Sequence, residues 1–173
     1  YSLASTDVIV DVQGWVVPDQ STAPFTAVTP SRLVDTRSGR QVAASSWLTV
    51  PVHGAAVTIA GAATTVPTTA TAAVVNVVVA DPDDAGFVTV WPCAGDVPLA
   101  ANLVYLSGDT RGNGVIAPIG PDGSICVYSL SSADIIVDIS GWLSGPTPGS
   151  GGFTGAVPNR FVDTRFAIGP LPV

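Results

Sequence analysis

The chain contains no lysine, no glutamate and no methionine among its 173 residues. These unbranched side chains favour helices, so their absence removes much of the material from which helices are built. Eighteen glycines and fifteen prolines also interrupt helical stretches. Valine and threonine, whose branched side chains suit pleated sheets, are abundant instead. The composition therefore predicts an all-β protein.

Positive charge is scarce as well. Six arginines stand against thirteen aspartates, which gives a net charge of −7. Nucleic acids and anionic membrane surfaces bind clustered Lys and Arg, so neither is an expected partner. A transmembrane helix needs about 20 predominantly apolar residues. The longest apolar run, residues 72–80, is interrupted by Asn76, so we expect no membrane insertion.

The cysteines are two, Cys93 and Cys126, and neither lies in a CxxC pair. One histidine, His53, cannot complete a zinc site with them. A disulfide between neighbouring strands is the first interpretation, and two buried free thiols are the alternative. Because disulfides persist outside the cytosol, the first interpretation predicts a secreted protein on an extracellular surface.

The most informative pattern is an internal repeat. Residues 1–15 (YSLASTDVIVDVQGW) match residues 128–142 (YSLSSADIIVDISGW) at ten of fifteen positions. Residues 25–37 (FTAVTPSRLVDTR) match residues 153–165 (FTGAVPNRFVDTR) at eight of thirteen positions. The period of about 128 residues far exceeds the 20–50 residues of solenoid repeats. Each repeat is therefore expected to be a whole domain, one bead of a tandem array.

Pro-, Gly- and Ser-rich linkers at residues 16–24 and 143–152 divide the chain. Residues 1–24 are then the end of a preceding repeat and its linker, or an exchanged strand. Residues 25–145 form one complete β-sandwich repeat, and residues 146–173 are a linker and the start of the next repeat. A frame of 1–127 fits the repeat equally well. We therefore expect the chain to be part of a longer protein.

Short apolar or alternating stretches, bounded by turn residues, predict the strands. Their number and spacing predict an antiparallel β-sandwich, jelly-roll-like in topology. The predicted strands are residues 6–12, 32–35, 47–52, 55–59, 70–80, 86–91, 101–106, 114–119, 124–128 and 134–139.

The duplicated strand is apolar on both faces, which is typical of a strand in the middle of a sheet. Its two copies, in residues 1–15 and 128–142, compete for one place in one complete bead. The first copy is therefore predicted to pair with another chain by strand addition, and the alternative is that the chain is a segment of a continuous polymer of beads. This predicted inter-subunit strand consists of Asp7, Val8, Ile9, Val10, Asp11 and Val12.

Asp138 lies inside an apolar strand, where an unpaired carboxylate is costly. Four of the six arginines belong to the two copies of the P-x-R-x-V-D-T-R element. We therefore predict a buried or semi-buried ion pair between Asp138 and Arg32 or Arg37, which ties the first strand of a bead to its last. The alternative is that Asp138 faces water on an edge strand.

Patterns that carry chemistry are few. His53 has no nucleophile-elbow motif to accompany it, and the aspartate pairs have turn or strand spacing, so the chain is predicted not to be an enzyme. No cofactor is expected, with calcium as the one candidate, since Asp81, Asp83 and Asp84 supply oxygen ligands within one loop. A solvated acidic turn is the alternative. The tryptophans and tyrosines are expected in the core or at bead joints, with a sugar-stacking surface as the alternative.

The elements DVIVDVQGW, PSRLVDTR, TATAAVVNVVV, ANLVYLSGD and ADIIVDISGW together resemble a repeat of large secreted surface proteins of actinobacteria and Chloroflexi. The DTR and D-x-x-G-W elements are its most distinctive marks, and the resemblance covers essentially the whole chain. It implies an accessory β-domain outside the cell, with no assigned chemistry and no ligand to carry over.

The sequence thus predicts an extracellular structural repeat module of a cell-surface or filament-forming protein, assembled through tandem beads and by β-strand exchange. Its expected partners are copies of itself or adjacent repeats. The alternative is a carbohydrate- or cell-wall-binding accessory module of a secreted enzyme, for which the partner is a cell-wall glycan.

Overall fold

The structure is a computed structural model that describes residues 7, 9–17, 25–145, 152–166 and 168. The regular elements in these ranges are β-strands and a single 3₁₀ turn, η1 (Thr36–Ser38). Within the same ranges, no helix has the length and apolar character to span a membrane. The prediction of an all-β protein is confirmed.

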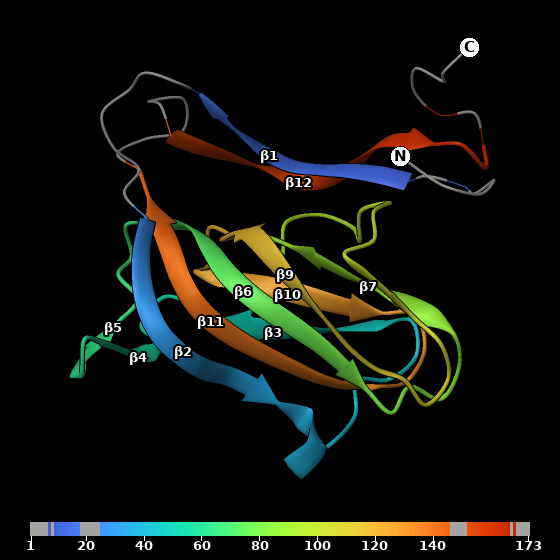
Figure 1. Cartoon of the computed structure of the whole chain (residues 1–173), viewed down its shortest axis with the longest axis horizontal. Coiled ribbons are helices and arrows are strands. Elements are labelled where there is room, and N and C mark those ends of the chain that lie inside the picture. Colours follow the sequence, from blue (N-terminus) through green and yellow to red (C-terminus); the bar gives the residue numbers. More distant parts are fainter. Residues whose placement is uncertain (1–6, 8, 18–24, 146–151, 167, 169–173) are drawn as a thin grey trace.

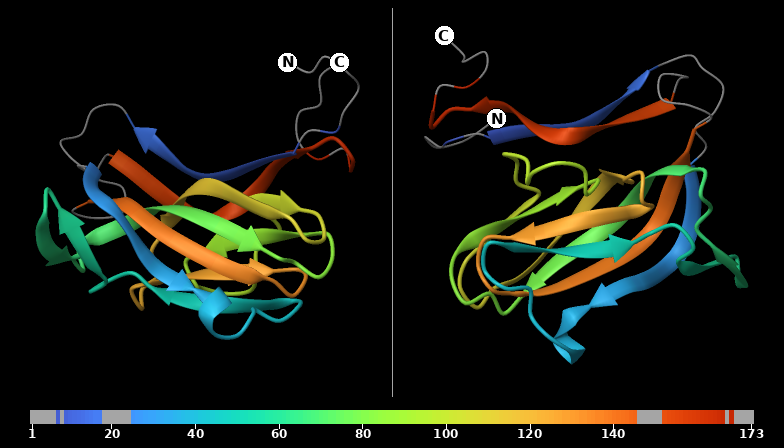
Figure 2. Two further views of the ribbon diagram at one scale, coloured as in Figure 1. Left: turned by 60° about the horizontal axis from the view of Figure 1, so that its bottom comes forward. Right: turned by 180° about the vertical axis from the view of Figure 1, so that it is seen from behind.

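Two antiparallel sheets are packed together, as Figures 1 and 2 show, so the predicted β-sandwich is confirmed. The larger sheet has six strands in the order β5 (Ala62–Thr65), β4 (Ala56–Ile59), β2 (Phe25–Asp35), β11 (Asp134–Ser144), β6 (Ala70–Ala80) and β9 (Thr110–Pro118). The smaller sheet has four strands in the order β3 (Ser46–Pro51), β10 (Ser124–Ser129), β7 (Gly86–Trp91) and β8 (Leu103–Tyr105). We call these two sheets together the body.

The core of the body lies between its two sheets and consists of branched aliphatic side chains. Every second residue of β11 points into it, because successive side chains of a strand point to opposite faces. Burying each such side chain stabilises the fold by roughly 1.5–3 kcal/mol. The central core residues are Val75, Val77 and Val79 of β6, Ile135, Val137 and Ile139 of β11, and Val50, Val88, Val90, Ile125 and Val127 of the smaller sheet.

A third, two-stranded antiparallel sheet lies apart from the body and consists of β1 (Ile9–Val17) and β12 (Gly152–Asp163). We call this sheet the ribbon. In Figure 1 it crosses the top of the molecule, and its strands contact β6, β7 and β9 of the body. The ribbon therefore pairs the first copy of one duplicated segment, in β1, with the second copy of the other, in β12. The two strands lie near opposite ends of the chain.

Candidate functional site

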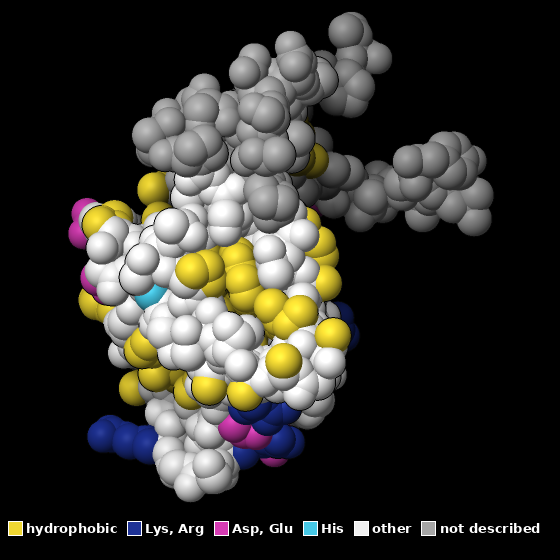
Figure 3. All heavy atoms as spheres, turned by 90° about the vertical axis from the view of Figure 1, so that its left-hand side faces the viewer, with side chains coloured by type: hydrophobic (Ala, Val, Ile, Leu, Met, Phe, Trp, Pro, Cys, Tyr) yellow, Lys and Arg dark blue, Asp and Glu magenta, His cyan; other side chains and the backbone are white. Residues whose placement is uncertain are grey.

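The two ends of the repeat meet in the body, where β2 pairs with β11. Arg32 is the ladder partner of Asp138, and its guanidinium forms ion pairs with Asp138 and with Asp35. The predicted pair between Asp138 and Arg32 is thus present. Arg32 is exposed to 45% and Asp138 to 27%, so the pair lies at the surface and is less buried than predicted. In the space-filling view of Figure 3, acidic and basic side chains lie side by side at the foot of the molecule.

Arg37, the alternative partner predicted for Asp138, pairs with Asp35 instead. Its Nη2 lies 2.7 Å from Oδ2 of Asp35, and its Nε donates to Oδ1 of the same carboxylate at 3.0 Å. The spacing of two residues explains the difference, because η1 folds Arg37 back over Asp35 and its backbone N–H also donates to that carboxylate. The hydrogen bonds from the Arg37 side chain, with its charge and that of Arg32, lower the pKa of Asp35 to about 2.

The threonine of the DTR element is also engaged. The hydroxyl of Thr36 donates to the carboxylate of Asp134 at 2.8 Å and accepts the backbone N–H of Ile135 at 2.9 Å. Thr36 and Arg32 therefore hold β2 against β11, and Asp35 links the two arginines within the β2 end of the site. We call the set of Arg32, Asp35, Thr36, Arg37, Asp134 and Asp138 the body clasp.

The ribbon contains a second clasp of the same design. The Arg160 guanidinium pairs with Asp11 at 2.9 Å and with Asp163 at 3.0 Å, and Arg165 pairs with Asp163 at 2.8 Å. The hydroxyl of Thr164 donates to Asp7 at 3.1 Å. These residues occupy the repeat positions of the body clasp, one for one. We call the set of Asp7, Asp11, Arg160, Asp163, Thr164 and Arg165 the ribbon clasp.

The strand register is duplicated as well. In the body, Asp138 is opposite Arg32 and Val137 is opposite Val34. In the ribbon, Asp11 is opposite Arg160 and Val10 is opposite Val162. Both ladders have irregularities at the same two steps, on either side of the segment that carries the aspartate. The repeated sequence therefore specifies the complete pairing of its end strand with its start strand.

The two clasps differ in burial. The side chains of Arg160 and Asp11 are exposed to only 9% and 8%, and Asp163 is fully buried. The pKa of Asp163 is lowered to about 2 by hydrogen bonds from the Arg165 side chain first, and further by the charges of Arg165 and Arg160. Asp11 also accepts the backbone N–H of Ala101 at 2.7 Å, which ties the ribbon to the body.

The apolar residues of the ribbon, unlike its charged residues, are more exposed than their counterparts in the body. Ile9 and Val10 are exposed to 38% and 42%, whereas Ile136 and Val137, their counterparts in β11, are exposed to 6% and 0%. The reason is the number of neighbours. β11 lies between β2 and β6, while β1 pairs only with β12 among the described residues. The ribbon has the clasp of a bead without the rest of its sandwich.

The predicted inter-subunit strand requires a correction. The prediction assumed that this strand has no partner in its own chain, and the structure pairs it with β12. The start of the following repeat, residues 153–165, supplies that partner, and the prediction did not count it as a strand. Ile9, Val10, Asp11 and Val12 lie in β1, Asp7 bonds to Thr164, and Val8 lies outside the described residues.

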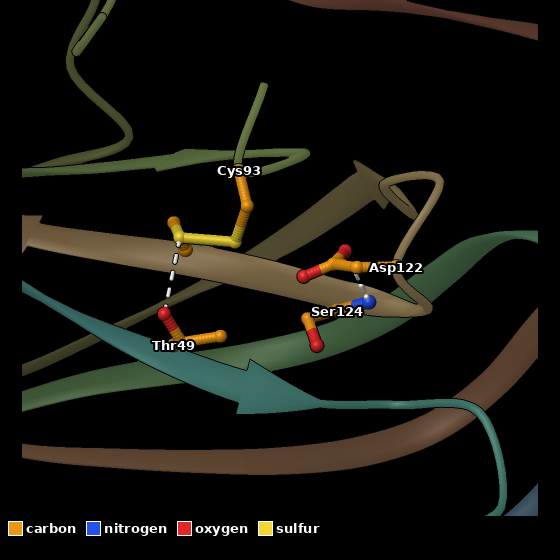
Figure 4. Close-up of a disulfide and its surroundings, with 5 residues drawn as sticks. Thr49, Cys93, Asp122 and Ser124 are labelled. Atoms are coloured by element: carbon orange, nitrogen blue, oxygen red, sulfur yellow. Dashed lines mark hydrogen bonds between the residues drawn. A yellow bond between two sulfur atoms is a disulfide. The ribbon is translucent and has the colours of Figure 1, made fainter. Parts of the chain in front are cut away.

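The disulfide between Cys93 and Cys126 is confirmed, with 4.9 Å between the two Cα atoms. Figure 4 shows it on β10, beside Thr49 of the neighbouring strand, whose hydroxyl lies 3.6 Å from Sγ of Cys126. In the same view, the carboxylate of Asp122 accepts the N–H of Ser124 and shapes the turn before β10. The bridge fastens the chain that follows β7 to the neighbouring strand of the smaller sheet.

The calcium candidates are not gathered into a ligand set. Asp81, Asp83 and Asp84 are exposed, and the backbone N–H groups of Asp83 and Asp84 are bonded to Ser132 and to Ser131. Across the described ranges, no group of three or more acidic, histidine or cysteine residues is placed to hold a metal ion.

The aromatic residues divide between the core and one surface. Trp142 is buried, as expected for core packing, and the side chain of Trp15 lies outside the described residues. Trp47 is exposed to 55% and packs edge-on against Trp91, with 6.2 Å between ring centroids. Trp47 and Tyr128 are ladder partners on β3 and β10, so their side chains share one face of the smaller sheet.

Protein-family models, characterised proteins and solved structures were each compared with the chain, and none of them matches it. The resemblance to secreted actinobacterial repeats therefore stands on the sequence motifs alone. The site is defined by the geometry of the two clasps.

Sequence reasoning missed the threonine contacts and the role of the first aspartate of each end strand. The signal was present, since Thr36 and Asp134 are both retained in the second copy, as Thr164 and Asp7. Asp134 and Asp7 are retained although the residues on either side of them differ between the copies, and this is the sequence signal of a contact between the end strand and the start strand.

Proposed function

We propose that this chain is a non-catalytic, extracellular structural repeat module of a cell-surface or filament-forming protein. Its beads are joined covalently in tandem and by exchange of strands at the clasps. The observation that carries the proposal is the duplicated clasp, because the same six side chains and the same register close the ends of a repeat in two places.

The chemistry of the clasp suits a coupling element. Its charges satisfy one another, so it presents no free nucleophile or general base for a reaction. Ion pairs also fix strand register, because any slip by one residue separates the charges and turns the apolar side chains to the opposite face. A module that must join many identical neighbours needs such a register-specific contact.

The disulfide supports the extracellular location. Disulfides form and persist in oxidising compartments, and Cys93 and Cys126 are joined in this fold. The oxidation state in native material is measurable by alkylation before and after reduction, read out by mass spectrometry. Labelling of both cysteines without reduction contradicts the extracellular location.

Electron microscopy of the native material that carries this chain tests the structural role. We expect beaded fibres or stalks with a spacing of one sandwich per repeat of about 128 residues. Isolated globular particles, attached to nothing and without a regular spacing, contradict the proposal.

A second candidate, a carbohydrate- or cell-wall-binding module, is supported by Trp47. An indole exposed to 55% on a sheet face, supported edge-on by Trp91, suits stacking against the apolar face of a sugar ring. A peptidoglycan pull-down with the native chain and with Trp47→Ala tests it. Retention of the native chain and loss of retention by Trp47→Ala favour this candidate over a purely structural one.

A further inference from the structure

We propose that β1 and β12 are exchangeable ends, through which this chain joins a second copy of itself. β1 of one copy pairs with β12 of the other, and the ribbon clasp forms between the chains with Asp11 from one and Arg160 from the other. This inference rests on the proposed function and names the partner and the contact residues of the exchange.

The first argument is that the clasp does not depend on chain connectivity. In the body, the charged partners are Arg32 and Asp138, 106 residues apart, and both belong to one repeat. In the ribbon they are Arg160 and Asp11, 149 residues apart, and they come from two different repeats. The ladders are nevertheless equivalent. An end strand therefore pairs with any start strand that reaches it, and a second copy of this chain offers both.

The second argument is geometric. β1 is joined to the body by residues 18–24 and β12 by residues 145–151, seven residues in each case. Val17 is opposite Gly152 in the ribbon, and Phe25 is opposite Leu143 in the body, so the two connections run between the same ends of the two ladders. Seven extended residues span at most about 25 Å. Each connection is therefore long enough for its strand to reach a partner up to that distance from the body while β2 and β11 stay paired.

The third argument is the incomplete packing of the ribbon. Cavities of about 360 Å³ and 440 Å³ remain where β1 and β12 meet the body. Ile9, Leu99, Val104 and Phe166 line the larger cavity, and each is more than a third exposed. The apolar contact between ribbon and body is thus incomplete and is supplemented by the hydrogen bond from Ala101 to Asp11, whereas β1 and β12 are joined by a full ladder and by the ion pairs of the ribbon clasp.

Concentration decides which arrangement forms. The closed monomer and the exchanged dimer contain the same clasp contacts, so their balance depends on the effective concentration of the two ends within one chain. Ends joined through short linkers have effective concentrations on the order of 1 mM. Exchange is therefore disfavoured in dilute solution and favoured in an array, where neighbouring chains are held close together.

Complementary charge reversals test the exchange. One variant carries Asp11→Arg and the other Arg160→Asp, so neither closes its own ribbon clasp, because each would place two like charges opposite one another. An equimolar mixture restores opposite charges in both clasps, but only between chains. By light scattering at micromolar concentration we expect each variant alone at 17.4 kDa and the mixture at twice that mass.

Two controls accompany this experiment. The single chain with both Asp11→Arg and Arg160→Asp restores the pair within the chain and is expected to stay monomeric. A mixture of Arg32→Asp with Asp138→Arg, which alters the body clasp, is expected not to dimerise, because exchange there requires opening the sandwich core. A mixture of the two ribbon variants that stays monomeric, with circular dichroism showing folded sandwiches, overturns the inference.

A second measurement leaves the charges intact. Val10 and Val162 are ladder partners, so Val10→Cys in one chain and Val162→Cys in another are expected to form an intermolecular disulfide when the two proteins are mixed and oxidised. Covalent dimers on a non-reducing gel support exchange, and their absence at concentrations up to 1 mM contradicts it. Such a failure leaves the covalent tandem array intact, which the electron microscopy of native material tests separately.

Discussion

The two clasps allow one substitution to be made in two environments. Asp138→Ala removes the carboxylate that Arg32 faces in the body, and Asp11→Ala removes its counterpart in the ribbon. The residue types and the register are equivalent, and Asp11 has one further hydrogen bond, from the backbone N–H of Ala101. Any difference between the two variants therefore reports on burial and on the surrounding structure rather than on the pair itself.

The expected effect of Asp138→Ala is small and global. The two side chains are exposed to 27% and 45%, and Arg32 keeps its pair with Asp35. Solvent-exposed pairs contribute about 0.2–1 kcal/mol, and we expect the upper half of that range here. In a domain of this size, 1 kcal/mol corresponds to about 2–4 °C in the unfolding midpoint. The variant should therefore unfold about 1–4 °C lower than the native chain.

The expected effect of Asp11→Ala is larger but local. Breaking an ion pair that is exposed to less than 10% costs about 3–5 kcal/mol if the rest of the structure stays in place. The ribbon has no core of its own, so it opens rather than bearing that cost. The body keeps the buried residues of β6 and β11 and is expected to unfold at the native temperature.

Thermal unfolding by circular dichroism, with hydrogen exchange read out by mass spectrometry, separates the two effects. For Asp138→Ala we expect a lower midpoint and native protection of β1 and β12. For Asp11→Ala we expect an unchanged midpoint and fast exchange in β1 and β12. A midpoint of Asp138→Ala equal to the native one would refute the body pair. A greater loss of global stability from Asp11→Ala would refute the local character of the ribbon.

Three further perturbations test the fold. Replacing both Cys93 and Cys126 by Ser opens a loop of 33 residues, which costs roughly 3–4 kcal/mol and should lower the calorimetric midpoint by about 6–15 °C. The pKa of Asp35 is lowered to about 2, so its ionised form stabilises the folded state above pH 4, and urea titrations should show that contribution lost as the pH falls from about 4 to 2. The variant Asp35→Asn should lack this part of the pH dependence. In Gly141→Ala, the added Cβ would lie 2.6 Å from the backbone oxygen of Thr26 and would also meet the ring of Phe25, so we expect a loss of about 1–3 kcal/mol, and native stability would contradict this packing.

Composition and periodicity predicted the fold class and most strands of the body, because burial imposes a pattern on the residues that face the core. β5 was not predicted, because none of its residues faces the core. Ala62–Thr65 is exposed at every position, so its sequence lacks the alternation of apolar and polar residues that burial imposes. The first half of β2 was not predicted, because a proline such as Pro30 usually ends a strand. Thr29, immediately before it, nevertheless pairs with Thr58 and so attaches β4 to β2.

The candidate site was predicted in part by elimination. Arg32 and Asp138 were identified as a pair because the chain has few cations and an aspartate inside an apolar strand needs one. Arg37 was the alternative partner of Asp138, but the 3₁₀ turn gives it a nearer carboxylate in Asp35. Elimination narrows the possible partners, and local backbone geometry then decides between them.

The clasp alone does not determine which strand pairs with β2. Asp11 and Arg32 lie in strands joined by seven residues, and a local hairpin between β1 and β2 would satisfy the same charges. Closing that shorter loop costs about 1 kcal/mol less conformational entropy than closing the repeat between Arg32 and Asp138. Burial of the core outweighs this difference in conformational entropy. β2 must lie beside β11, because Ile135, Val137 and Ile139 of β11 complete the core against the smaller sheet. The core therefore selects the partner within a bead, and the clasp fixes the register. No such core surrounds the strands of the ribbon, so nothing there selects a partner strand from the same chain over one from a second copy. We therefore expect strand exchange in the ribbon and not in the body.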